Sequence, residues 1–357
     1  GPWNIRTFKN PPYLKPRWQN DIVRLIEEEF VPISPSTHQV EEEYQSEHGG
    51  LHMQDCQLRF FNHVFTPIRV GKNYRLPYTT VVYSDLKKSG KTAIQAAFFM
   101  AYSRLFGGEL FFCTNSREQS RDRAYWRVYQ WLSYLQRTNE AKYEEICTRQ
   151  DIEWIELQNP YASIRPLPVA PGTSAGAFQS VTGWDELWDY DREAAIRLYS
   201  EMQPIPTIPD VTIPDGFIDA GKTIVAPGLR FISTYVGYYG ESSLLWAIYE
   251  ETVNEDPDTQ QARGKRIKGL EDLPCFVSED GQTAAYWNQD TPRMPWQTPE
   301  FIERARKDPL NKLRPEEFRR LWQNRWSSGN ESFIDMALVR DSMQRGKERG
   351  LYNVHPV

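Results

Sequence analysis

The sequence is poor in the residues that build metal centres and disulfide frameworks. Five histidines are spread over 357 residues, so catalysis based on histidine is not expected. Four cysteines are present, and none lies close enough to another to form a CxxC pair. We therefore interpret them as reduced thiols of a cytosolic protein. These cysteines are Cys56, Cys113, Cys147 and Cys275.

Long apolar runs and an excess of basic residues are missing as well. No apolar run approaches the length of a membrane span and no signal peptide is recognisable, so we expect no membrane partner. The formal net charge is -6 and the sequence pI is about 5.6. Because no overall basic field indicates nucleic acid, DNA binding would need a local site on an acidic protein.

The composition is that of a globular α/β protein. Hydrophobic residues make up 39% and charged residues 25% of the chain, which suits one large domain or two modest ones. From about residue 75, runs typical of buried strands alternate with runs typical of helices, which predicts a mostly parallel sheet with helices on both faces. Strands are expected at 78–84, 109–115, 152–157, 161–169 and 229–236, and helices at 93–106, 117–136, 192–202 and 242–252.

Breaks in this pattern divide the chain into segments. Ser116 is expected to cap the helix at 117–136. A proline-rich stretch at 204–216 is expected to be a loop and a basic stretch at 260–269 a linker. The predicted segments are 1–2, an expression scar; 3–74, an N-terminal lead segment packed on the core; 75–290, the α/β core; and 291–357, a C-terminal helical subdomain or linker.

Two stretches resemble a phosphate-binding P-loop, G-x-x-x-x-G-K-[ST]. GFIDAGKT (216–223) fits the formula at every position, whereas DLKKSGKT (85–92) has Asp85 in place of the first glycine. A P-loop needs a buried strand before it and a helix after it, because the helix N-terminus directs free N–H groups at the phosphates. Only DLKKSGKT has both flanks, and Pro227 argues against a helix after the other stretch. We therefore predict that GFIDAGKT is a turn before a strand.

The residues of the predicted loop have distinct roles. Gly90 permits close backbone approach, Lys91 reaches the β- and γ-phosphates, and Thr92 binds Mg²⁺. The Asp85 carboxylate would lie near the cradle. Its charge would be offset by the remaining basic residues of the loop, Lys87 and Lys88, which are followed by Ser89.

An acidic pair supplies what a P-loop alone lacks. In FQSVTGWDELWDYD (178–191), Asp185 would hold Mg²⁺ and Glu186 would polarise water. The alternative is a surface acidic turn with packing tryptophans. Ser233 and Thr234 follow a further apolar run and would sense the γ-phosphate by hydrogen bonding, unless they are ordinary hydroxyls at a strand end.

Two other patterns have weaker interpretations. His48, His52 and Cys56 have the i, i+4, i+8 spacing of ligands on one helix face, but two glycines between them argue against a helix and hence against zinc. Basic residues between Arg263 and Lys268, and others between Arg340 and Arg349, could contact a phosphate backbone or be solvated surface.

These elements, in this order, resemble the large terminase subunit of tailed bacteriophages, the motor that packages DNA into procapsids. The resemblance covers about 14–334. VVYSDLKKSGKTAIQAAF is similar to the family's variant Walker A, in which a basic residue, here Lys87, stands four positions before the P-loop lysine. GWDELWDYD resembles its Walker B with the catalytic glutamate, and FISTYVGYYGESSLLWAIYEE its coupling motif. PRMPWQTPEF and FRRLWQNRWSSGNESFID resemble the end of the ATPase half, around Asn324, Trp326 and Phe333.

The resemblance implies further site residues. LKPRWQ (14–19) is similar to a leading segment whose glutamine approaches adenine, which nominates Gln19. Arg117 is a candidate for the family's trans-acting arginine finger, and Lys87 joins Lys91 and Glu186 as a catalytic candidate. The family also carries a C-terminal nuclease domain. Because 23 residues follow Ile334, we expect the ATPase domain without nuclease activity.

The implied fold is an α/β P-loop NTPase of the RecA-like (ASCE) class with N-terminal and C-terminal additions. The implied activity is hydrolysis of ATP, with Mg²⁺ as cofactor, to move double-stranded DNA in the cytoplasm of an infected bacterium. Expected partners are the portal protein, the small terminase subunit and further copies of the chain in a ring, with a monomer in isolation. A helicase or other DNA translocase, a P-loop kinase and a non-catalytic nucleotide-binding scaffold remain as alternatives.

Overall fold

A computed structural model gives the fold of most of the chain. It describes residues 21–66, 68–70, 73–114, 123–168, 179–190, 193–204, 208–212, 223–226, 228–239, 243–253, 263–309, 311, 314–327 and 336–349.

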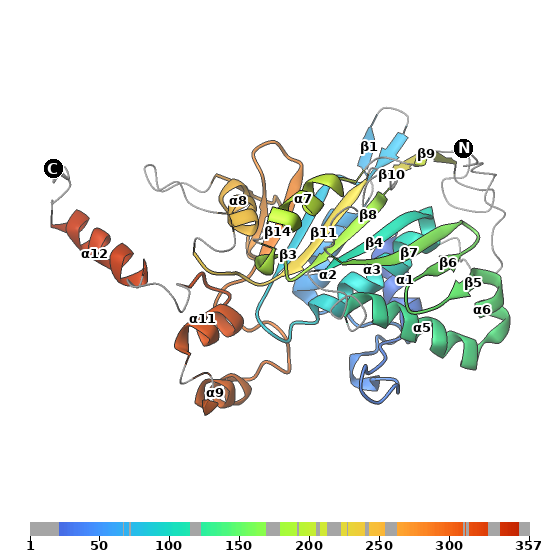
Figure 1. Cartoon of the computed structure of the whole chain (residues 1–357), viewed down its shortest axis with the longest axis horizontal. Coiled ribbons are helices and arrows are strands. Elements are labelled where there is room, and N and C mark those ends of the chain that lie inside the picture. Colours follow the sequence, from blue (N-terminus) through green and yellow to red (C-terminus); the bar gives the residue numbers. More distant parts are fainter. Residues whose placement is uncertain are drawn as a thin grey trace.

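A large sheet forms the centre of the molecule (Figure 1). Six neighbouring strands of this sheet, β14 to β7 in the order below, are parallel, and antiparallel strands extend it at both edges. Within the described residues the order of its ten strands is β12 (Lys265–Arg266), β13 (Cys275–Val277), β14 (Thr283–Trp287), β3 (Thr80–Ser84), β11 (Leu229–Thr234), β8 (Gln179–Asp185), β4 (Gly108–Thr114), β7 (Ala162–Pro168), β6 (Ile155–Leu157) and β5 (Cys147–Gln150).

A second, smaller sheet contains part of the stretch that fits the P-loop formula. Its order is β1 (Ile68–Val70), β2 (Asn73–Arg75), β10 (Thr223–Ala226) and β9 (Ile208–Thr212). Thr223, the last residue of GFIDAGKT, begins strand β10 and not a helix, which confirms the prediction of a strand there. Residues 216–222 lie outside the described part of the chain. The prediction of a loop throughout 204–216 is wrong, because β9 forms within it and pairs with β10.

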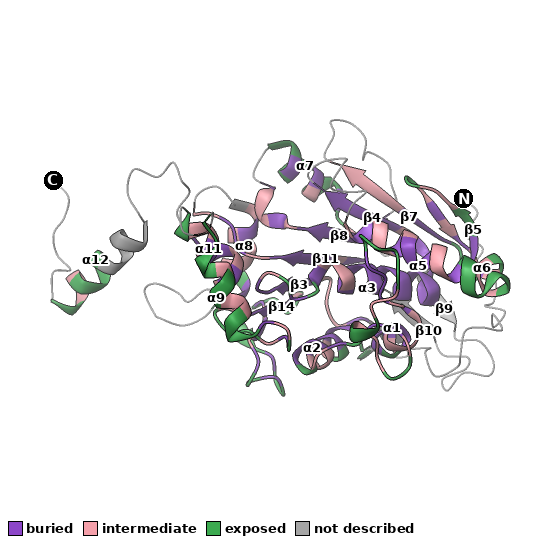
Figure 2. Ribbon diagram, turned by 90° about the horizontal axis from the view of Figure 1, so that it is seen from below, coloured by how far each residue is buried: buried purple, intermediate pink, exposed green. Residues whose placement is uncertain are grey.

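Helices cover both faces of the large sheet. The α-helices of the described residues are α1 (Ile22–Glu29), α2 (Asp55–Phe65), α3 (Lys91–Phe106), α5 (Ala124–Thr138), α6 (Glu140–Ile146), α7 (Glu193–Glu201), α8 (Ser243–Thr252), α9 (Pro299–Lys307), α11 (Pro315–Gln323) and α12 (Met336–Glu348). Helix α12 lies apart from the sheet (Figure 1). Strand β3 alternates between the two faces: Val81 and Tyr83 pack with α1, α2, α3 and α5, whereas Val82 packs with α7 and α8. Figure 2 shows the buried strands between these two helical layers.

The helix that follows β3 lies very close to the sheet. A Cβ atom at Gly183 of β8 would be 2.8 Å from the Cε2 and Cζ atoms of Phe99 on α3. In addition, Gln95 of α3 donates its side-chain amide to the carbonyl oxygens of Trp184 and Phe231, at 3.4 and 3.1 Å. Helix α3 is thereby fixed across β8 and β11, the strands that deliver the candidate acidic and sensing residues.

Several sequence-based boundaries need correction. Helix α5 begins at Ala124 with Arg123 at its N-cap, and not at 117 behind a Ser116 cap; Ser116 itself lies outside the described residues. Helix α6 and strand β5 were not predicted. The expected linker at 260–269 contains strand β12, which with β13 and β14 extends the sheet beyond β3. In the described residues, no helix is long and apolar enough to cross a membrane.

Candidate functional site

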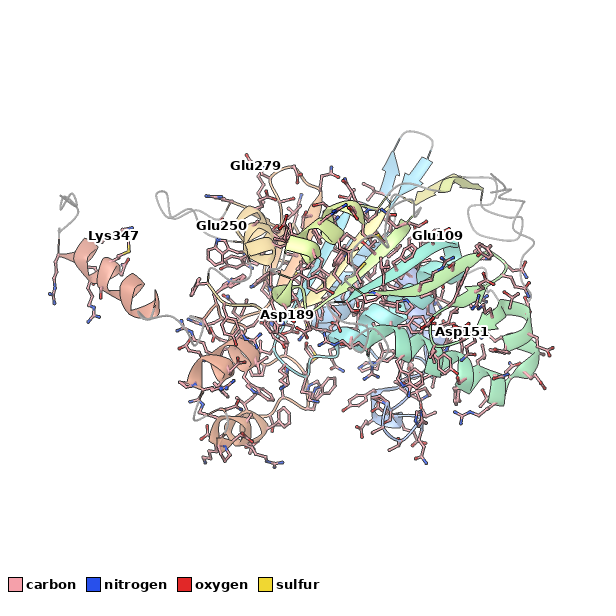
Figure 3. The ribbon with its side chains drawn as sticks, in the orientation of Figure 1. Glu109, Asp151, Asp189, Glu250, Glu279 and Lys347 are labelled. Atoms are coloured by element: carbon pink, nitrogen blue, oxygen red, sulfur yellow. The ribbon has the colours of Figure 1, made fainter. Side chains whose placement is uncertain are left out.

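The candidate residues meet at the carboxyl-terminal ends of the parallel strands. Strand β11 lies between β3 and β8, and its register places Thr234 opposite Ser84 and Ser233 opposite Asp185. The loops that follow the three strands therefore emerge side by side. In Figure 3, Asp189 lies just beyond the carboxyl-terminal end of β8. Glu109, near the start of β4, marks the opposite, amino-terminal ends of the strands.

The loop between β3 and α3 has the backbone of an anion cradle. Gly90 at the N-cap has a φ of +80°, a left-handed conformation that glycine adopts without strain. The carbonyl oxygens of residues 85–89 all accept hydrogen bonds from side chains. The donors are Lys91 Nζ to Asp85 (2.9 Å) and Leu86 (3.1 Å), Gln297 Nε2 to Lys87 (3.0 Å), Trp296 Nε1 to Lys88 (2.7 Å) and Gln57 Nε2 to Ser89 (2.8 Å).

This bonding has a direct consequence for ligand binding. Because five carbonyl dipoles are engaged by side chains, the loop presents less negative potential to an anion. The first N–H groups of α3 lack partners within the helix and attract negative charge. Lys91 is 7% exposed and stands in the first turn of α3, followed by the half-buried Thr92. Burial lowers the pKa of Lys91, and the charges of Glu186 and Asp85 oppose this shift.

Asp85, which replaces the first glycine of the motif, is engaged in a buried network. Its carboxylate accepts hydrogen bonds from the Leu86 N–H at 2.8 Å, Asn288 Nδ2 at 2.8 Å and the Tyr83 hydroxyl at 3.0 Å. Burial raises the pKa of this carboxyl group, and the nearby charge of Lys91 is the main opposing influence. Asp85 is therefore a structural acceptor.

The surroundings of Lys87 and Lys88 differ from those expected from the sequence. The two lysines were expected to offset the Asp85 carboxylate, whereas the charge that opposes its pKa shift is that of Lys91. The Lys87 ammonium lies 5.9 Å from the ring centre of Trp322, and Lys88 is exposed at the rim of the loop. Both remain near enough to the cradle for a role toward phosphate.

Asp185 ends strand β8 and is 4% exposed. Its Oδ1 accepts the Ser233 hydroxyl at 2.8 Å, and its Oδ2 faces Arg123 Nη1 at 3.4 Å. Burial alone would lower the pKa of Arg123, but the charges of Asp185 and Glu186 raise it above its usual value. Arg123 was not predicted from the sequence, where the only signal for it is its place six residues after Arg117 in REQSRDR (117–123).

Glu186 stands immediately after β8 with a φ of 60°, in the left-handed region. Its N–H donates to the Ser233 carbonyl at 2.8 Å, and its Oε2 accepts the indole N–H of Trp188 at 3.1 Å. Burial raises the pKa of Glu186 to about 7, and the adjacent charge of Asp185 adds to the shift. A carboxyl group with such a pKa is suited to accepting a proton near neutral pH.

The two candidate sensing residues lie where β11 ends. Ser233 is fully buried and bonded to Asp185, so its hydroxyl orients the acidic pair. The Thr234 hydroxyl donates to the Tyr235 carbonyl at 2.8 Å, and the Thr234 carbonyl accepts the Asp85 N–H at 3.2 Å. Strand β11 therefore contacts both the P-loop and the acidic pair.

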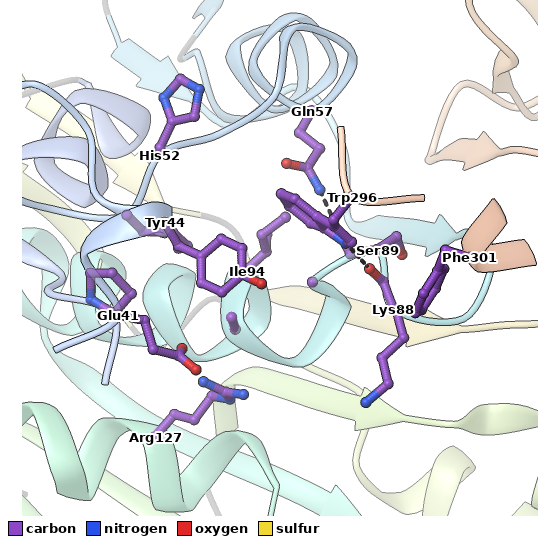
Figure 4. A pocket seen from close by; sticks show the side chains of 14 residues that line it. Glu41, Tyr44, His52, Gln57, Lys88, Ser89, Ile94, Arg127, Trp296 and Phe301 are labelled. Atoms are coloured by element: carbon purple, nitrogen blue, oxygen red, sulfur yellow. Dashed lines mark hydrogen bonds between the residues drawn. The ribbon is translucent and has the colours of Figure 1, made fainter. Parts of the chain in front are cut away.

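A cavity of about 460 Å³ opens beside the P-loop (Figure 4). Its walls come from the N-terminal segment, the start of α3, α5 and the stretch before α9. Tyr44 and Trp296 meet edge to face across it, with ring centres 5.1 Å apart, and Glu41 and Arg127 point toward one another at one end. The volume and aromatic walls suit a small planar molecule. The lining residues are Pro32, Glu41, Tyr44, Leu51, His52, Gln57, Lys88, Ser89, Gly90, Ala93, Ile94, Arg127, Trp296 and Phe301.

Helix α11 closes the site from the C-terminal side. Its Leu321 carbonyl accepts the Lys87 N–H at 2.7 Å. At its C-cap, the buried Asn324 donates to Ser84 Oγ at 2.9 Å and to the Asn288 carbonyl at 2.7 Å, and it accepts the Val236 N–H at 2.8 Å. One side chain thus joins the ends of β3, β11 and β14.

The remaining predicted residues have other outcomes. Gln19 and Arg117 lie outside the described residues. His48 and His52 are exposed, and Cys56 is buried at the start of α2. In the part of the chain that the structure describes, no three His, Cys, Asp or Glu side chains gather as a metal cluster. The Thr92 hydroxyl and the Asp185 carboxylate are hard oxygen donors, the kind of ligand that Mg²⁺ prefers.

Comparisons with known proteins find similar structures but no match in sequence. No family model matches the chain, and no curated protein matches it in sequence. The HK97 bacteriophage large terminase is similar in structure, with a TM-score of 0.51 and 13% identity, over 87% of this chain and 55% of that protein. The large terminase ATPase domain of Thermus phage P74-26 gives a TM-score of 0.44 at 12% identity, over 76% of this chain and 98% of that domain. A mutant of that domain gives 0.43 at 13% identity, over 75% and 98%.

The likeness to the HK97 protein concerns the fold. The chain spans 55% of the length of that protein. The predicted fold class, α/β with a mostly parallel sheet and helices on both faces, is confirmed. In the observed sheet order, one strand separates the P-loop strand β3 from the acidic strand β8.

Proposed function

We propose that this chain is the ATPase of a phage large terminase and hydrolyses ATP to drive double-stranded DNA into a procapsid. The observation that carries the proposal is the position of the Asp185–Glu186 pair. The pair follows the carboxyl-terminal end of β8, and the loop with Lys91 follows the same end of β3. One strand, β11, lies between β3 and β8. The structural likeness to the HK97 bacteriophage large terminase supports it as well.

The P-loop would hold the phosphates of ATP. The N–H groups at the start of α3 would bind the phosphate oxygens, and Lys91 and Lys87 would add positive charge. Lys91 would exchange its hydrogen bonds to the loop carbonyls of Asp85 and Leu86 for phosphate oxygens. The cavity beside Ser89 and Gly90 would receive the nucleoside.

Thr92 and Asp185 would hold Mg²⁺. When bound, this ion would neutralise charge that develops on the phosphate oxygens. Ser233 holds the Asp185 carboxylate through a hydrogen bond to Oδ1. Arg123, which faces Oδ2, balances the charge of the acidic pair.

Glu186 would orient the attacking water and accept its proton. Its pKa of about 7 supports this role, because the carboxylate is a stronger base than a solvated glutamate and is still ionised in a large fraction at neutral pH. The Trp188 N–H limits the freedom of the Glu186 side chain, and the Ser233 carbonyl holds its backbone N–H. Such preorganisation is the main contribution a protein makes to phosphoryl transfer.

The motor role extends beyond the single chain. The partners proposed are double-stranded DNA, the portal protein, the small terminase subunit and further copies in a ring, in the cytoplasm of the infected bacterium. The formal net charge of -6 predicts weak DNA binding by the monomer, with basic side chains converging only on assembly.

Steady-state ATP hydrolysis with and without duplex DNA tests the proposal. Lys91→Ala should lower turnover by at least about 100-fold. Lys222→Ala, the matching change in the other P-loop-like stretch, should leave turnover close to that of the parent. Stimulation by duplex DNA is expected for a translocase. Transfer of phosphate to a small molecule would favour a kinase, and ATP binding without turnover a scaffold.

A further inference from the structure

A buried arginine of the C-terminal helix α11 lies within an aromatic cage next to the acidic pair. Arg320 is 4% exposed, and its Nη2 donates to Glu317 Oε2 at 2.8 Å. The guanidinium carbon is 4.0 Å from the ring centre of Trp188, 4.8 Å from that of Tyr238 and 4.9 Å from that of Tyr235. A cation this close to aromatic faces is attracted by their electrons, more strongly where water is excluded.

The same indole is fixed from two further sides. Trp188 stacks on Tyr235 with ring centres 5.8 Å apart and 25° between the planes, and it meets Tyr238 edge to face at 6.0 Å. Its N–H points at Oε2 of Glu186, 3.1 Å away. The direction of this hydrogen bond therefore depends on how the indole is packed against Arg320.

We propose that Arg320 is a positioning residue for Glu186, acting through the Trp188 indole, so that helix α11 controls the orientation of the carboxylate that activates water. This inference rests on the proposed ATP hydrolysis. Among the described hydrogen bonds, that of Arg320 goes to Glu317 and not to Glu186, so its route to the carboxylate is the contact with the Trp188 indole.

The position of α11 makes the arrangement a link between the site and the C-terminal segment. The helix also binds the P-loop backbone, since Leu321 accepts the Lys87 N–H at 2.7 Å. Asn324 at its C-cap holds Ser84 at the end of β3. One rigid helix thus contacts both the phosphate cradle and the residue that holds Glu186. A shift of α11 would change the two together.

A merely structural role for Arg320 predicts different kinetics. Loss of a packing residue would lower stability and the active fraction, with no particular dependence on Trp188. Loss of a positioning residue lowers kcat of the folded enzyme and leaves KM for ATP almost unchanged, because ground-state binding does not involve Glu186. The two cases are therefore separated by kcat per active site, measured after titration with a tight-binding nucleotide analogue.

The first experiment compares three single variants. Arg320→Met keeps an unbranched apolar stem but removes the guanidinium and its charge, and should lower kcat at least about tenfold with KM within about twofold of the parent. Arg320→Lys restores a cation over the ring and should recover part of the loss. Arg165→Met is the matched control, since Arg165 stacks on Trp154 at 3.6 Å on strand β7, two strands away from β8. It should leave kcat unchanged.

The second experiment tests the route through the indole. Trp188→Phe keeps an aromatic ring but removes the N–H donor to Glu186, and it should lower kcat by itself. If Arg320 acts through that donor, Arg320→Met should add little in the Trp188→Phe background. The inference would be overturned if the fold losses in kcat of the two single variants multiplied in the double variant, or if Arg320→Met left kcat unchanged. Either result would leave ATP hydrolysis in place. A parent chain without turnover would overturn the proposed function and this inference with it.

Discussion

Ser233 donates its hydroxyl hydrogen to Oδ1 of Asp185 at 2.8 Å, and the Ser233 carbonyl accepts the N–H of Glu186 at 2.8 Å. One residue of β11 therefore fixes both members of the acidic pair that follows β8. The bonds depend on the parallel register that places Ser233 opposite Asp185. The turn after β8 is held from the neighbouring strand, so Glu186 leaves the sheet in a defined direction.

The first prediction concerns the proposed water-activating residue. Glu186→Gln keeps the size of the side chain and an oxygen that can accept the Trp188 N–H, but it removes the base. Turnover of ATP should fall by about 100-fold or more, while ATP still binds. Turnover and binding are measured separately, by phosphate release and by calorimetry.

The control for this variant is an exposed glutamate on the next helix. Glu193→Gln, in the first turn of α7, makes the same chemical change away from the site and should keep parental turnover. If Glu186→Gln turns over ATP at the parental rate, Glu186 is not the base and the assignment of the acidic pair is wrong.

The second prediction is a pH dependence. Burial and the charge of Asp185 raise the pKa of Glu186 to about 7, and a base must be deprotonated to act. The carboxylate is therefore available above pH 7 and is lost as the pH falls through this value. The kcat/KM for ATP should decline by about tenfold per pH unit on the acidic side, as measured in buffers of constant ionic strength.

A variant of the neighbouring tryptophan tests whether Glu186 causes this loss of kcat/KM at low pH, the acidic limb of the profile. The Trp188 N–H stabilises the ionised carboxylate and so lowers the Glu186 pKa. In Trp188→Phe the donor is gone, and the midpoint of the acidic limb should move to higher pH. Protonation of ATP itself is the same for both proteins, so a midpoint that does not move would assign the limb to another group.

The core of this site could be predicted from the sequence because its determinants are local. A β-branched and aromatic strand, a loop ending in Gly90 and an alanine-rich helix follow one another within 30 residues, and the structure has β3 and α3 there. The flanks also separated the two P-loop-like stretches correctly at Thr223, which begins β10.

The contacts around the P-loop could not be predicted, because they join residues far apart in the chain. Asn288, Trp296 and Gln297 are separated by about 200 residues from the groups they bind, and nothing in their local sequence indicates those partners. Strands β12 and β13 have two and three residues, too few for a recognisable alternation. Tertiary pairing determines such short strands more than propensity does.

The third prediction tests the cavity beside the P-loop. Trp296→Ala removes an aromatic wall and the N–H that binds the Lys88 carbonyl, and should raise KM for ATP by about fivefold to 100-fold through loss of base stacking. The kcat should change little, because Glu186 and Lys91 are not contacted by this side chain in the described hydrogen bonds. Initial rates over a range of ATP concentrations give both constants.

A second substitution at this position separates stacking from loop support. Trp296→Phe retains a stacking ring but cannot donate to Lys88, which the indole does at 2.7 Å. If stacking dominates, Trp296→Phe should keep most of the parental affinity. A KM as high as that of Trp296→Ala would assign the effect to the loop backbone, and an unchanged KM in both variants would remove the cavity from the nucleotide site.

The fourth prediction concerns the residue that departs from the P-loop formula. Asp85→Gly restores the glycine of the formula but removes the acceptor for the Leu86 N–H and for Asn288 Nδ2. Each buried donor left without a partner costs about 1–3 kcal/mol, and three donors, the third being the Tyr83 hydroxyl, lose this acceptor, so the free energy of unfolding should fall by at least that amount. Chemical denaturation followed by tryptophan fluorescence measures the loss.

Asp85→Asn tests whether the stability of the protein depends on the acceptor atoms of this side chain. An amide oxygen can still accept one of the three donors, so this variant should lose less stability than Asp85→Gly. Since the carboxylate is bonded to Tyr83 and Asn288 and does not line the cavity, ATP affinity of the folded protein should stay close to the parental value in both variants. If Asp85→Gly were more stable and bound ATP more tightly, Asp85 would be an unfavourable replacement of glycine rather than the structural acceptor described above.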